Sequence, residues 1–215
     1  MNNQDRTIKL EKINKGFGEK HVLNDLNYTF CTNACYVLQG ESGIGKTTLL
    51  NIIGGYLEAD SGNVYISDNM KMDYMFQEEM LFSNLTVAEN LALKYYADSE
   101  KEEWDTQFIE KEYSKVLAQF RIEKLLNQKV NSLSGGEKQR VLLASMIISN
   151  AQILLLDEPV TKLDQENREQ ILKMIEECVK DRIVIIVSHI ELGLQCNVKI
   201  LELEDGKLYE EKSNS

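Results

Sequence analysis

A glycine-rich segment between an apolar run and a helical pattern restricts this chain to few folds. Residues 40–47 read GESGIGKT and match the phosphate-loop pattern G-x4-G-K-[ST] at every fixed position. The apolar run from Cys35 to Leu38 has the content of a buried strand, and the residues from Thr48 to Ile53 have helical character. Strand, glycine loop and helix in this order predict a parallel α/β fold with a bound phosphate chain.

Each residue type in this loop suits phosphate binding. Glycines let successive backbone N–H groups point inward, and the following helix adds the positive end of its dipole. The Lys46 ammonium can reach the outer phosphates, and the Thr47 hydroxyl can ligate Mg2+. A chance glycine-rich turn would lack the flanking strand and helix. We therefore predict that the nucleotide contacts the residues Gly40, Glu41, Ser42, Gly43, Ile44, Gly45, Lys46, Thr47 and Thr48.

A second apolar run, residues 153–158 (ILLLDE), ends in two carboxylates. The carboxyl ends of buried strands are where ligands bind in open α/β sheets, although acidic residues there can also begin a solvated loop. We expect Asp157 to hold Mg2+ through its water shell and Glu158 to orient the water that attacks the γ-phosphate. His189 follows the apolar run 182–188, which places it at the same sheet edge, although a single histidine is more often structural.

The rest of the chain agrees with this fold class. Its 215 residues, 43% hydrophobic and 27% charged, suffice for one large or two small globular domains. The runs 152–157 and 182–188 are nearly continuous, as in parallel strands covered on both faces. The other expected elements are antiparallel strands at 7–14 and 21–30, helices within 86–127 and after Gly136, an amphipathic helix at 165–180 and a C-terminal hairpin around Asp205-Gly206.

Composition argues against several classes of protein. The net charge of −11 repels nucleic acid, so we expect no nucleic-acid partner. The apolar stretches are far shorter than the ~20 residues of a membrane helix, and the N-terminus lacks the pattern of a secretory signal. We therefore expect a cytoplasmic chain. Four cysteines, interpreted as reduced packing residues, lie at Cys31, Cys35, Cys178 and Cys196.

Taken in order, the motifs resemble the nucleotide-binding domains of ABC transporters over essentially the whole chain. The matching segments are the phosphate loop, Gln77 in YMFQEEMLF, LSGGE at 133–137, ILLLDEP at 153–159, a D-loop-like segment at 160–164 and Ser188-His189. The resemblance implies a P-loop NTPase of the ABC ATPase type that binds and hydrolyses ATP with Mg2+. It implies one domain over 1–215, with a mixed, largely parallel core and an N-terminal antiparallel β-subdomain at 1–77 and 150–215, and a helical signature subdomain at 78–149.

The same resemblance implies roles for three residues outside the phosphate loop. Phe17 looks like the aromatic that stacks on adenine. Gln77 looks like the residue that senses Mg2+ and the transport partner, and His189 like the switch that contacts the γ-phosphate. The simpler alternatives stay open: Phe17 as a core residue and Gln77 as an ordinary polar loop residue.

The LSGGE segment predicts a second copy of the chain. The Ser134 hydroxyl and the amides of Gly135 and Gly136, at the start of a helix beginning near Glu137, form another anion site, and an ordinary helix cap fits the same residues. One chain cannot easily bring two phosphate-binding ends to one ATP. The family's solution is an ATP-dependent head-to-tail homodimer, in which Ser134 and Gly136 of one copy contact the γ-phosphate bound by Lys46 of the other.

Within the family, the short chain and the runs LSGGEKQRV and LLLDEP look most like the small ATPases of peptide, lipoprotein or bacteriocin export permeases. The resemblance implies a separate transmembrane permease as partner. It also implies a position on the inner face of the cell membrane, which the chain contacts only through that permease. A soluble ABC-type ATPase of an assembly or repair complex and an ordinary P-loop kinase are the alternatives.

The chain departs from that pattern in three places. Only 32 residues separate Gly45 from Gln77, which indicates that the β-subdomain has lost a helical insert. Ser145 replaces a residue that is commonly basic, and Lys162 one that is commonly small. None of these positions belongs to the predicted catalytic set. The hydrophobic segment 80–82 after Gln77 suits either a permease-docking surface or a buried position.

Overall fold

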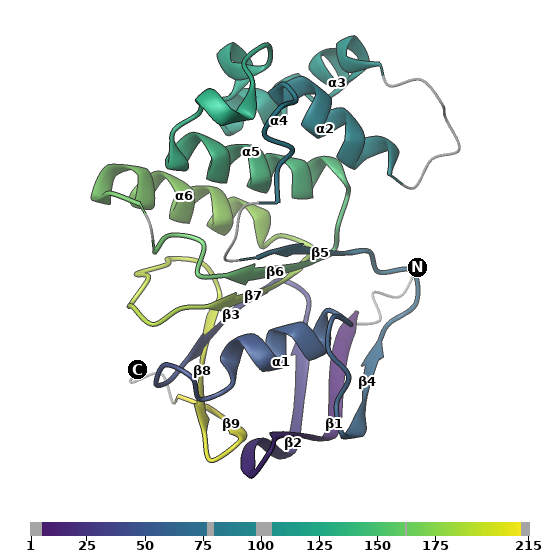
Figure 1. Ribbon diagram of the computed structural model, residues 1–215, viewed down its shortest axis with the longest axis vertical. Helices are drawn as coiled ribbons and strands as arrows, with labels where there is room; N and C mark the ends of the chain where they lie inside the picture. The colour runs from purple at the N-terminus through teal and green to yellow at the C-terminus, as the bar shows by residue number, and fades with distance from the viewer. Residues whose placement is uncertain (1–5, 77–79, 98–104, 162, 212–215) are drawn as a thin grey trace.

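A six-stranded sheet with helices on both faces forms the centre of the molecule (Figure 1). The computed structural model describes residues 6–76, 80–97, 105–161 and 163–211. The strand order is β5-β6-β7-β3-β8-β9, parallel except for β9. The strands are β5 (Met72–Met75), β6 (Ile153–Asp157), β7 (Ile183–Val187), β3 (Ala34–Gln39), β8 (Val198–Glu204) and β9 (Lys207–Glu210).

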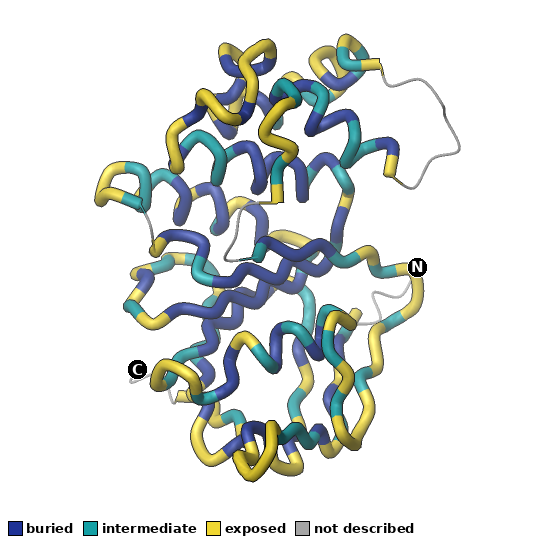
Figure 2. Tube along the Cα trace, in the orientation of Figure 1, coloured by how far each residue is buried: buried dark blue, intermediate teal, exposed yellow. Residues whose placement is uncertain are grey.

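The alternation of side chains along the central strands explains why both faces are covered. In β6, Leu154 and Leu156 pack into the hydrophobic cluster that contains α5 (Gly135–Ile148) and α6 (Gln165–Cys178). Ile153 and Leu155 pack into the opposite cluster, which contains α1 (Lys46–Ile53). The prediction that the continuous apolar runs are parallel strands buried on both faces is therefore confirmed. Figure 2 shows these strands as the most continuously buried part of the chain.

A second sheet has three strands and is antiparallel, as predicted for the N-terminal segment. Its order is β2 (Lys20–Cys31), β1 (Thr7–Phe17) and β4 (Ser61–Ile66). The inner residues of β1 share one hydrophobic cluster with α1 and with the central sheet. The phosphate-loop helix is thereby held between the two sheets.

The helices in the middle of the chain lie on the side of the central sheet opposite α1 (Figure 1). They are α2 (Val87–Tyr96), α3 (Thr106–Glu112), α4 (Ser114–Gln119) and α5. The helix expected to begin near Glu137 begins at Gly135, because the Ser134 side chain caps it. The predicted subdomain limits at residues 78 and 149 stay a prediction.

The C-terminal hairpin is confirmed as β8 and β9. Asp205 (φ 49°) and Gly206 (φ 75°) form its turn in the left-handed region, which tight hairpin turns require. Cys35 and Cys178 are buried, while Cys31 and Cys196 are half-buried. Within the described ranges, every helix is too short or too polar to cross a membrane.

Candidate nucleotide-binding site

The phosphate loop and the start of α1, the carboxyl ends of β6 and β7, and the adjoining ends of β1 and β2 form a cleft of about 560 Å3. This volume lies within the range of small-molecule sites, roughly 300–1,000 Å3. The cleft brings together segments that are far apart in the sequence. Its lining residues are Phe17, Lys20, Val22, Ser42, Gly43, Gly45, Lys46, Thr47, Thr48, Glu158, Val187 and His189.

The phosphate loop owes its path to glycine at Gly45. This residue has φ 123°, which side-chain-bearing residues rarely adopt. A Cβ atom there would lie 2.2 Å from Val22 Cγ1, so another residue would fit only if the Val22 side chain moved. The close packing of the loop against β2 sets the direction in which α1 leaves it.

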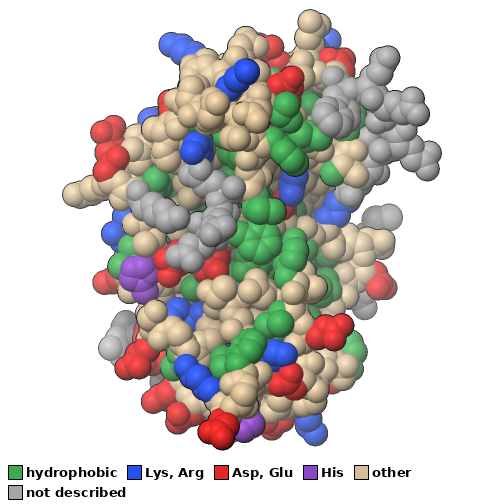
Figure 3. Space-filling model, in the orientation of Figure 1, with side chains coloured by type: hydrophobic (Ala, Val, Ile, Leu, Met, Phe, Trp, Pro, Cys, Tyr) green, Lys and Arg blue, Asp and Glu red, His purple; other side chains and the backbone are tan. Residues whose placement is uncertain are grey.

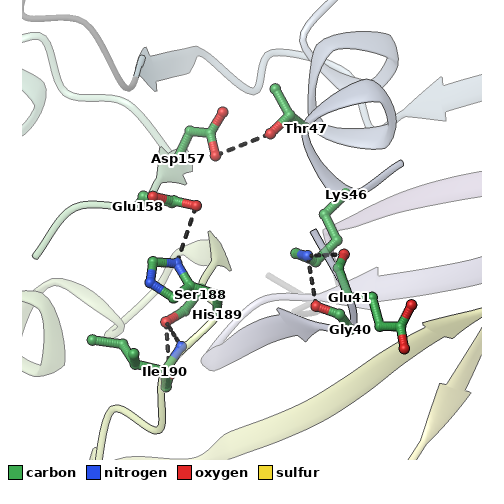
Figure 4. Close-up of polar contacts among 9 residues, drawn as sticks. All are labelled: Gly40, Glu41, Lys46, Thr47, Asp157, Glu158, Ser188, His189 and Ile190. Carbon is green, nitrogen blue, oxygen red and sulfur yellow. Dashed lines mark hydrogen bonds and ion pairs between the residues drawn. The ribbon is translucent and has the colours of Figure 1, made fainter. Parts of the chain in front are cut away.

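Lys46 lies folded over the loop that precedes it. Its Nζ donates hydrogen bonds of 2.8 Å to the carbonyl oxygens of Gly40 and Glu41 (Figure 4). Burial lowers the pKa of Lys46, and the carboxylates of Glu158 and Asp157 oppose that shift. A lysine ammonium carries three N–H donors, so it can hold this position and still meet a phosphate oxygen.

Thr47 and Asp157 meet across the cleft although they are 110 residues apart. Thr47 Oγ1 donates a hydrogen bond of 3.3 Å to Asp157 Oδ1 (Figure 4). Asp157 is 4% exposed, and its burial raises the pKa of the carboxyl, with Glu158 adding to the shift and the Thr47 bond opposing it. A hydroxyl and a carboxylate beside a phosphate loop are hard oxygen ligands, which is the donor set that suits Mg2+.

Glu158 and His189 form the third polar contact. His189 Nδ1 lies 3.2 Å from Glu158 Oε1 (Figure 4). Glu158 has φ 53°, in the left-handed region, and its backbone N–H donates to the carbonyl oxygen of Val187. Strained backbone of this kind is common where a side chain must be aimed at a ligand. Two predicted catalytic side chains, 31 residues apart in the chain, thus lie together at the cleft.

The signature segment lies elsewhere. Among the described residues that line the cleft, none comes from 133–137. Ser134 forms a capping box with Glu137, and Ser134 and Gly135 are exposed at the start of α5, across the central sheet from α1. A single chain therefore does not join the two predicted phosphate-binding ends.

Family comparison agrees with the motif order. The family model described as ABC transporter matches residues 23–161, which run from β2 to beyond β6. The chain belongs to this ABC transporter family. Membership removes the P-loop kinase alternative and confirms the resemblance.

Similar proteins cover nearly the whole of this ABC cassette. It is 33% identical over 214 residues to the sulfate/thiosulfate import ATP-binding protein CysA of Mannheimia succiniciproducens, covering 94% of this chain and 60% of that protein. It is 33% identical over 222 residues to the putative hemin import ATP-binding protein HrtA of Staphylococcus aureus, with 94% and 98% covered. The chain thus spans about three fifths of CysA and nearly all of HrtA.

Solved cassettes share the fold. The dimeric structure of MJ0796, a bacterial ABC transporter cassette, has a TM-score of 0.82 and 28% identity, over 97% of this chain and 99% of that one. A post-hydrolysis dimer of MJ0796 bound to ADP and Pi gives a TM-score of 0.81. The predicted ABC ATPase fold class is confirmed.

Sequence analysis did not indicate two residues that lie at the cleft or at the signature segment. Lys20 lines the cleft, and its Nζ donates a 3.0 Å hydrogen bond to the carbonyl oxygen of Gly43. Asn167, near the start of α6, packs against Gly136 of the signature segment. Neither belongs to a motif; the only sequence signal is that Lys20 follows Phe17 in a turn and Asn167 follows the D-loop-like segment.

The remaining predictions concern Phe17, Gln77 and Lys162. Phe17 is 52% exposed at the cleft and is therefore not a core residue. Lys15 Nζ lies 5.5 Å from its ring centroid. Gln77 and Lys162 lie outside the described residues.

Proposed function

We propose that this ABC cassette hydrolyses ATP as a head-to-tail homodimer and energises a separate membrane permease. The observation that carries the proposal is the separation of its two phosphate-binding ends. Lys46 lies in the cleft, whereas Ser134 and Gly135 are exposed at the start of α5 on the other side of the central sheet. An ATP molecule in the cleft would leave one face for the signature segment of a second copy.

The contacts in the cleft support a role for each site residue. Lys46 and the loop amides bind the β- and γ-phosphates. Thr47 and Asp157 would hold Mg2+, which neutralises charge on the phosphates when bound. Glu158 orients and polarises the attacking water, and its contact with His189 holds the two side chains together at the cleft.

Other predicted roles complete this mechanism. The exposed ring of Phe17 at the cleft stacks on adenine. Gln77 reports the state of the site to the permease. Ser134, Gly135 and Gly136 of the second copy close over the γ-phosphate, because a helix N-terminus with exposed amides binds anions.

A second hollow, of about 540 Å3, suits the permease. It lies between the helical layer and the segment around β5, where hydrophobic side chains gather in Figure 3. Tyr56, Met80 and Phe82 line it and are 63%, 66% and 63% exposed. Ser145, the departure from the family pattern, is buried in its wall. An uncharged residue at position 145 suits an apolar permease segment better than a basic residue would, since the charges that line this hollow, Lys94 and Asp73, are paired with each other.

We further propose that the permease is an exporter of a peptide, lipoprotein, bacteriocin or other amphipathic substrate, and that the cassette lies at the inner face of the cell membrane. The support is the sequence pattern, the runs LSGGEKQRV and LLLDEP. The names of the two relatives CysA and HrtA specify import, so the direction of transport needs a direct test. Uptake or loss of labelled substrate in cells with and without the cassette and its permease would decide it.

The catalytic part of the proposal is tested with Glu158→Gln. We expect this variant to bind ATP, lose turnover and accumulate as a dimer in size-exclusion chromatography with ATP. Adding Ser134→Arg should return it to a monomer, whereas Lys173→Ala, on the solvent face of α6, should not. Normal turnover by Glu158→Gln, or a dimer that ignores Ser134→Arg, would contradict the proposal.

The permease part is tested separately. Phe82→Asp should abolish co-purification with a polytopic membrane protein after detergent extraction, while ATP binding is kept. Tyr209→Asp is the matched control, because Tyr209 is 51% exposed on β9, outside the hollow. Co-purification with soluble proteins alone would favour the assembly-complex alternative.

A further inference from the structure

Two of the four cysteines lie together at the end of the central sheet where β3 begins. Cys35 is on β3, and Cys196 lies two residues before β8. The backbone N–H of Cys35 donates a 2.9 Å hydrogen bond to Asn197, and Cys35 pairs with Val198 in the parallel register. This pairing holds the segment that carries Cys196 against the start of β3. Both sulfurs pack in the cluster between the sheet and α6.

The two thiols also interact directly. Their side chains are close enough for a hydrogen bond between the two sulfurs to be the largest influence on the pKa of each thiol. Because Cys35 donates in that bond when Cys196 is ionised, the bond lowers the pKa of Cys196, against the opposing effects of burial and of Glu176. The same bond, followed by burial, raises the pKa of Cys35.

The two thiols differ in their exposure to solvent. Cys35 is fully buried, whereas Cys196 is half-buried and reaches solvent. An accessible thiol of lowered pKa next to a buried thiol is the arrangement of redox-sensing pairs, in which the first sulfur reacts with the oxidant and the second forms the disulfide with it. The proposed ATPase mechanism uses neither residue.

We propose that Cys35 and Cys196 are a reversible dithiol/disulfide pair that is oxidised by peroxides. The Cys196 thiolate attacks one peroxide oxygen, so that an S–O bond forms, the O–O bond breaks and the leaving hydroxide takes up a proton as water. Cys35 then loses its proton and attacks the sulfenic sulfur; an S–S bond forms, the S–O bond breaks and a second water leaves. Two thiols are oxidised and one hydrogen peroxide is reduced to two waters. A small dithiol reverses the step by exchange.

The disulfide would tether a functional segment. Residues 190–197 connect His189, at the cleft, with β8. At present β3 holds the far end of this segment through the hydrogen bond to Asn197. A disulfide at Cys196 would add a covalent bond to β3 where a hydrogen bond that can break now holds the segment. We expect slower amide hydrogen exchange over 190–197 in the oxidised protein.

The other two cysteines serve as internal controls. Cys178 is buried on α6 and donates to the Met174 carbonyl oxygen at 3.0 Å. Burial raises the pKa of its thiol to about 12. Cys31 is half-buried at the end of β2. Neither is held beside another cysteine by the pairing of β3 with β8, on which the proposal depends.

The experiment treats the folded full-length chain with equimolar hydrogen peroxide, blocks free thiols with iodoacetamide and maps the peptides by mass spectrometry. We expect a Cys35–Cys196 disulfide as the main product, alkylated Cys31 and Cys178, and full reversal by dithiothreitol. Cys31→Ser and Cys178→Ser should leave this pattern unchanged. A Cys31–Cys35 bridge, a bridge between chains, or equal oxidation of all four thiols would overturn the proposal.

Single variants separate the two steps. With Cys35→Ser, oxidation should stop at a Cys196 sulfenic acid, which dimedone traps. With Cys196→Ser, dimedone should label Cys35 at least tenfold less. Circular dichroism checks that both variants fold. If Cys35→Ser unfolds, the wild-type protein still shows which thiol reacts first. Dimedone present during its oxidation should label Cys196 and not Cys35. Labelling of Cys35 and not Cys196 would contradict the assignment.

Discussion

The side chain of Asn167 occupies the space that a Cβ atom on Gly136 would need. Such an atom would lie 2.6 Å from Asn167 Oδ1. Asn167 is held in place by Asp164, which accepts from its backbone N–H at 3.0 Å and from its Nδ2 at 2.7 Å. Arg140 Nη1 donates to Asn167 Oδ1 at 3.3 Å. The starts of the signature helix and of α6 therefore pack as one unit.

This contact predicts that Gly136→Ala destabilises the chain. The added methyl forces Asn167 out of its hydrogen bonds, which should cost about 1–3 kcal/mol of unfolding free energy in urea titrations. Asn167→Ala in the same chain removes the two closest atoms, Oδ1 and Cγ, and leaves its Cβ at 3.2 Å. The double variant should therefore recover at least ~0.5 kcal/mol relative to additivity.

Gly135→Ala is the matched control for the Gly136→Ala variant. A Cβ atom at Gly135 meets no other atom within 4 Å, and the residue is in the helix without a positive φ. We expect this variant to be neutral or up to about 1 kcal/mol more stable, as alanine is the better helix former. Equal losses at Gly135 and Gly136 would show that the Asn167 contact is not the cause.

Lys46→Ala should abolish nucleotide binding. The variant loses the ammonium that donates hydrogen bonds to the Gly40 and Glu41 carbonyl oxygens of the phosphate loop. Titration with a fluorescent ATP analogue measures this directly. Lys20→Ala should weaken binding less, because Lys20 contacts the loop only through the Gly43 carbonyl oxygen. Wild-type affinity in Lys46→Ala would contradict the assignment of the cleft.

Asp157→Asn should make the nucleotide-free protein more stable at neutral pH. Burial raises the pKa of Asp157 above its ordinary 3.8, so the folded chain holds this proton more tightly than the unfolded chain. Ionised Asp157 therefore opposes folding, fully above the folded pKa and less as pH falls toward 3.8. The difference in Tm between variant and wild type should shrink over that range. Stabilisation by Mg2+ and ATP should be lost in the variant.

Lys94→Met should destabilise the junction between the sheet and the helical layer. Asp73 on β5 is 7% exposed and accepts from Lys94 Nζ at 2.7 Å and from Ser149 Oγ at 3.0 Å. Removing the ammonium leaves a buried carboxylate with fewer donors, which should cost about 1–3 kcal/mol in urea unfolding. Ser149→Ala removes only a neutral donor and should cost less. A larger loss of unfolding free energy for Ser149→Ala would show that the Ser149 hydroxyl, and not the Lys94 ammonium, stabilises the junction.

Sequence patterns located the elements whose signals are local. The apolar runs of β6 and β7, the glycines before α1 and the Asp205-Gly206 turn were all predictable, because neighbouring residues determine them. The edge strands β4 and β5 were missed, since six and four residues of mixed polarity, respectively, give no clear period. The helical pattern within 86–127 was predicted, but its division into α2, α3 and α4 was not.

By itself, the sequence determined the family, the phosphate loop and the identity of the acidic and histidine side chains, because each depends on residue type and spacing along the chain. Tertiary structure alone decided which of them meet. Thr47 reaches Asp157, and Glu158 reaches His189, because parallel pairing of β3, β6 and β7 brings their carboxyl ends to one edge. The same sheet keeps the signature segment away from the cleft, and it also brings Cys196 beside Cys35. No local pattern encodes these distances, because they follow from the register between strands.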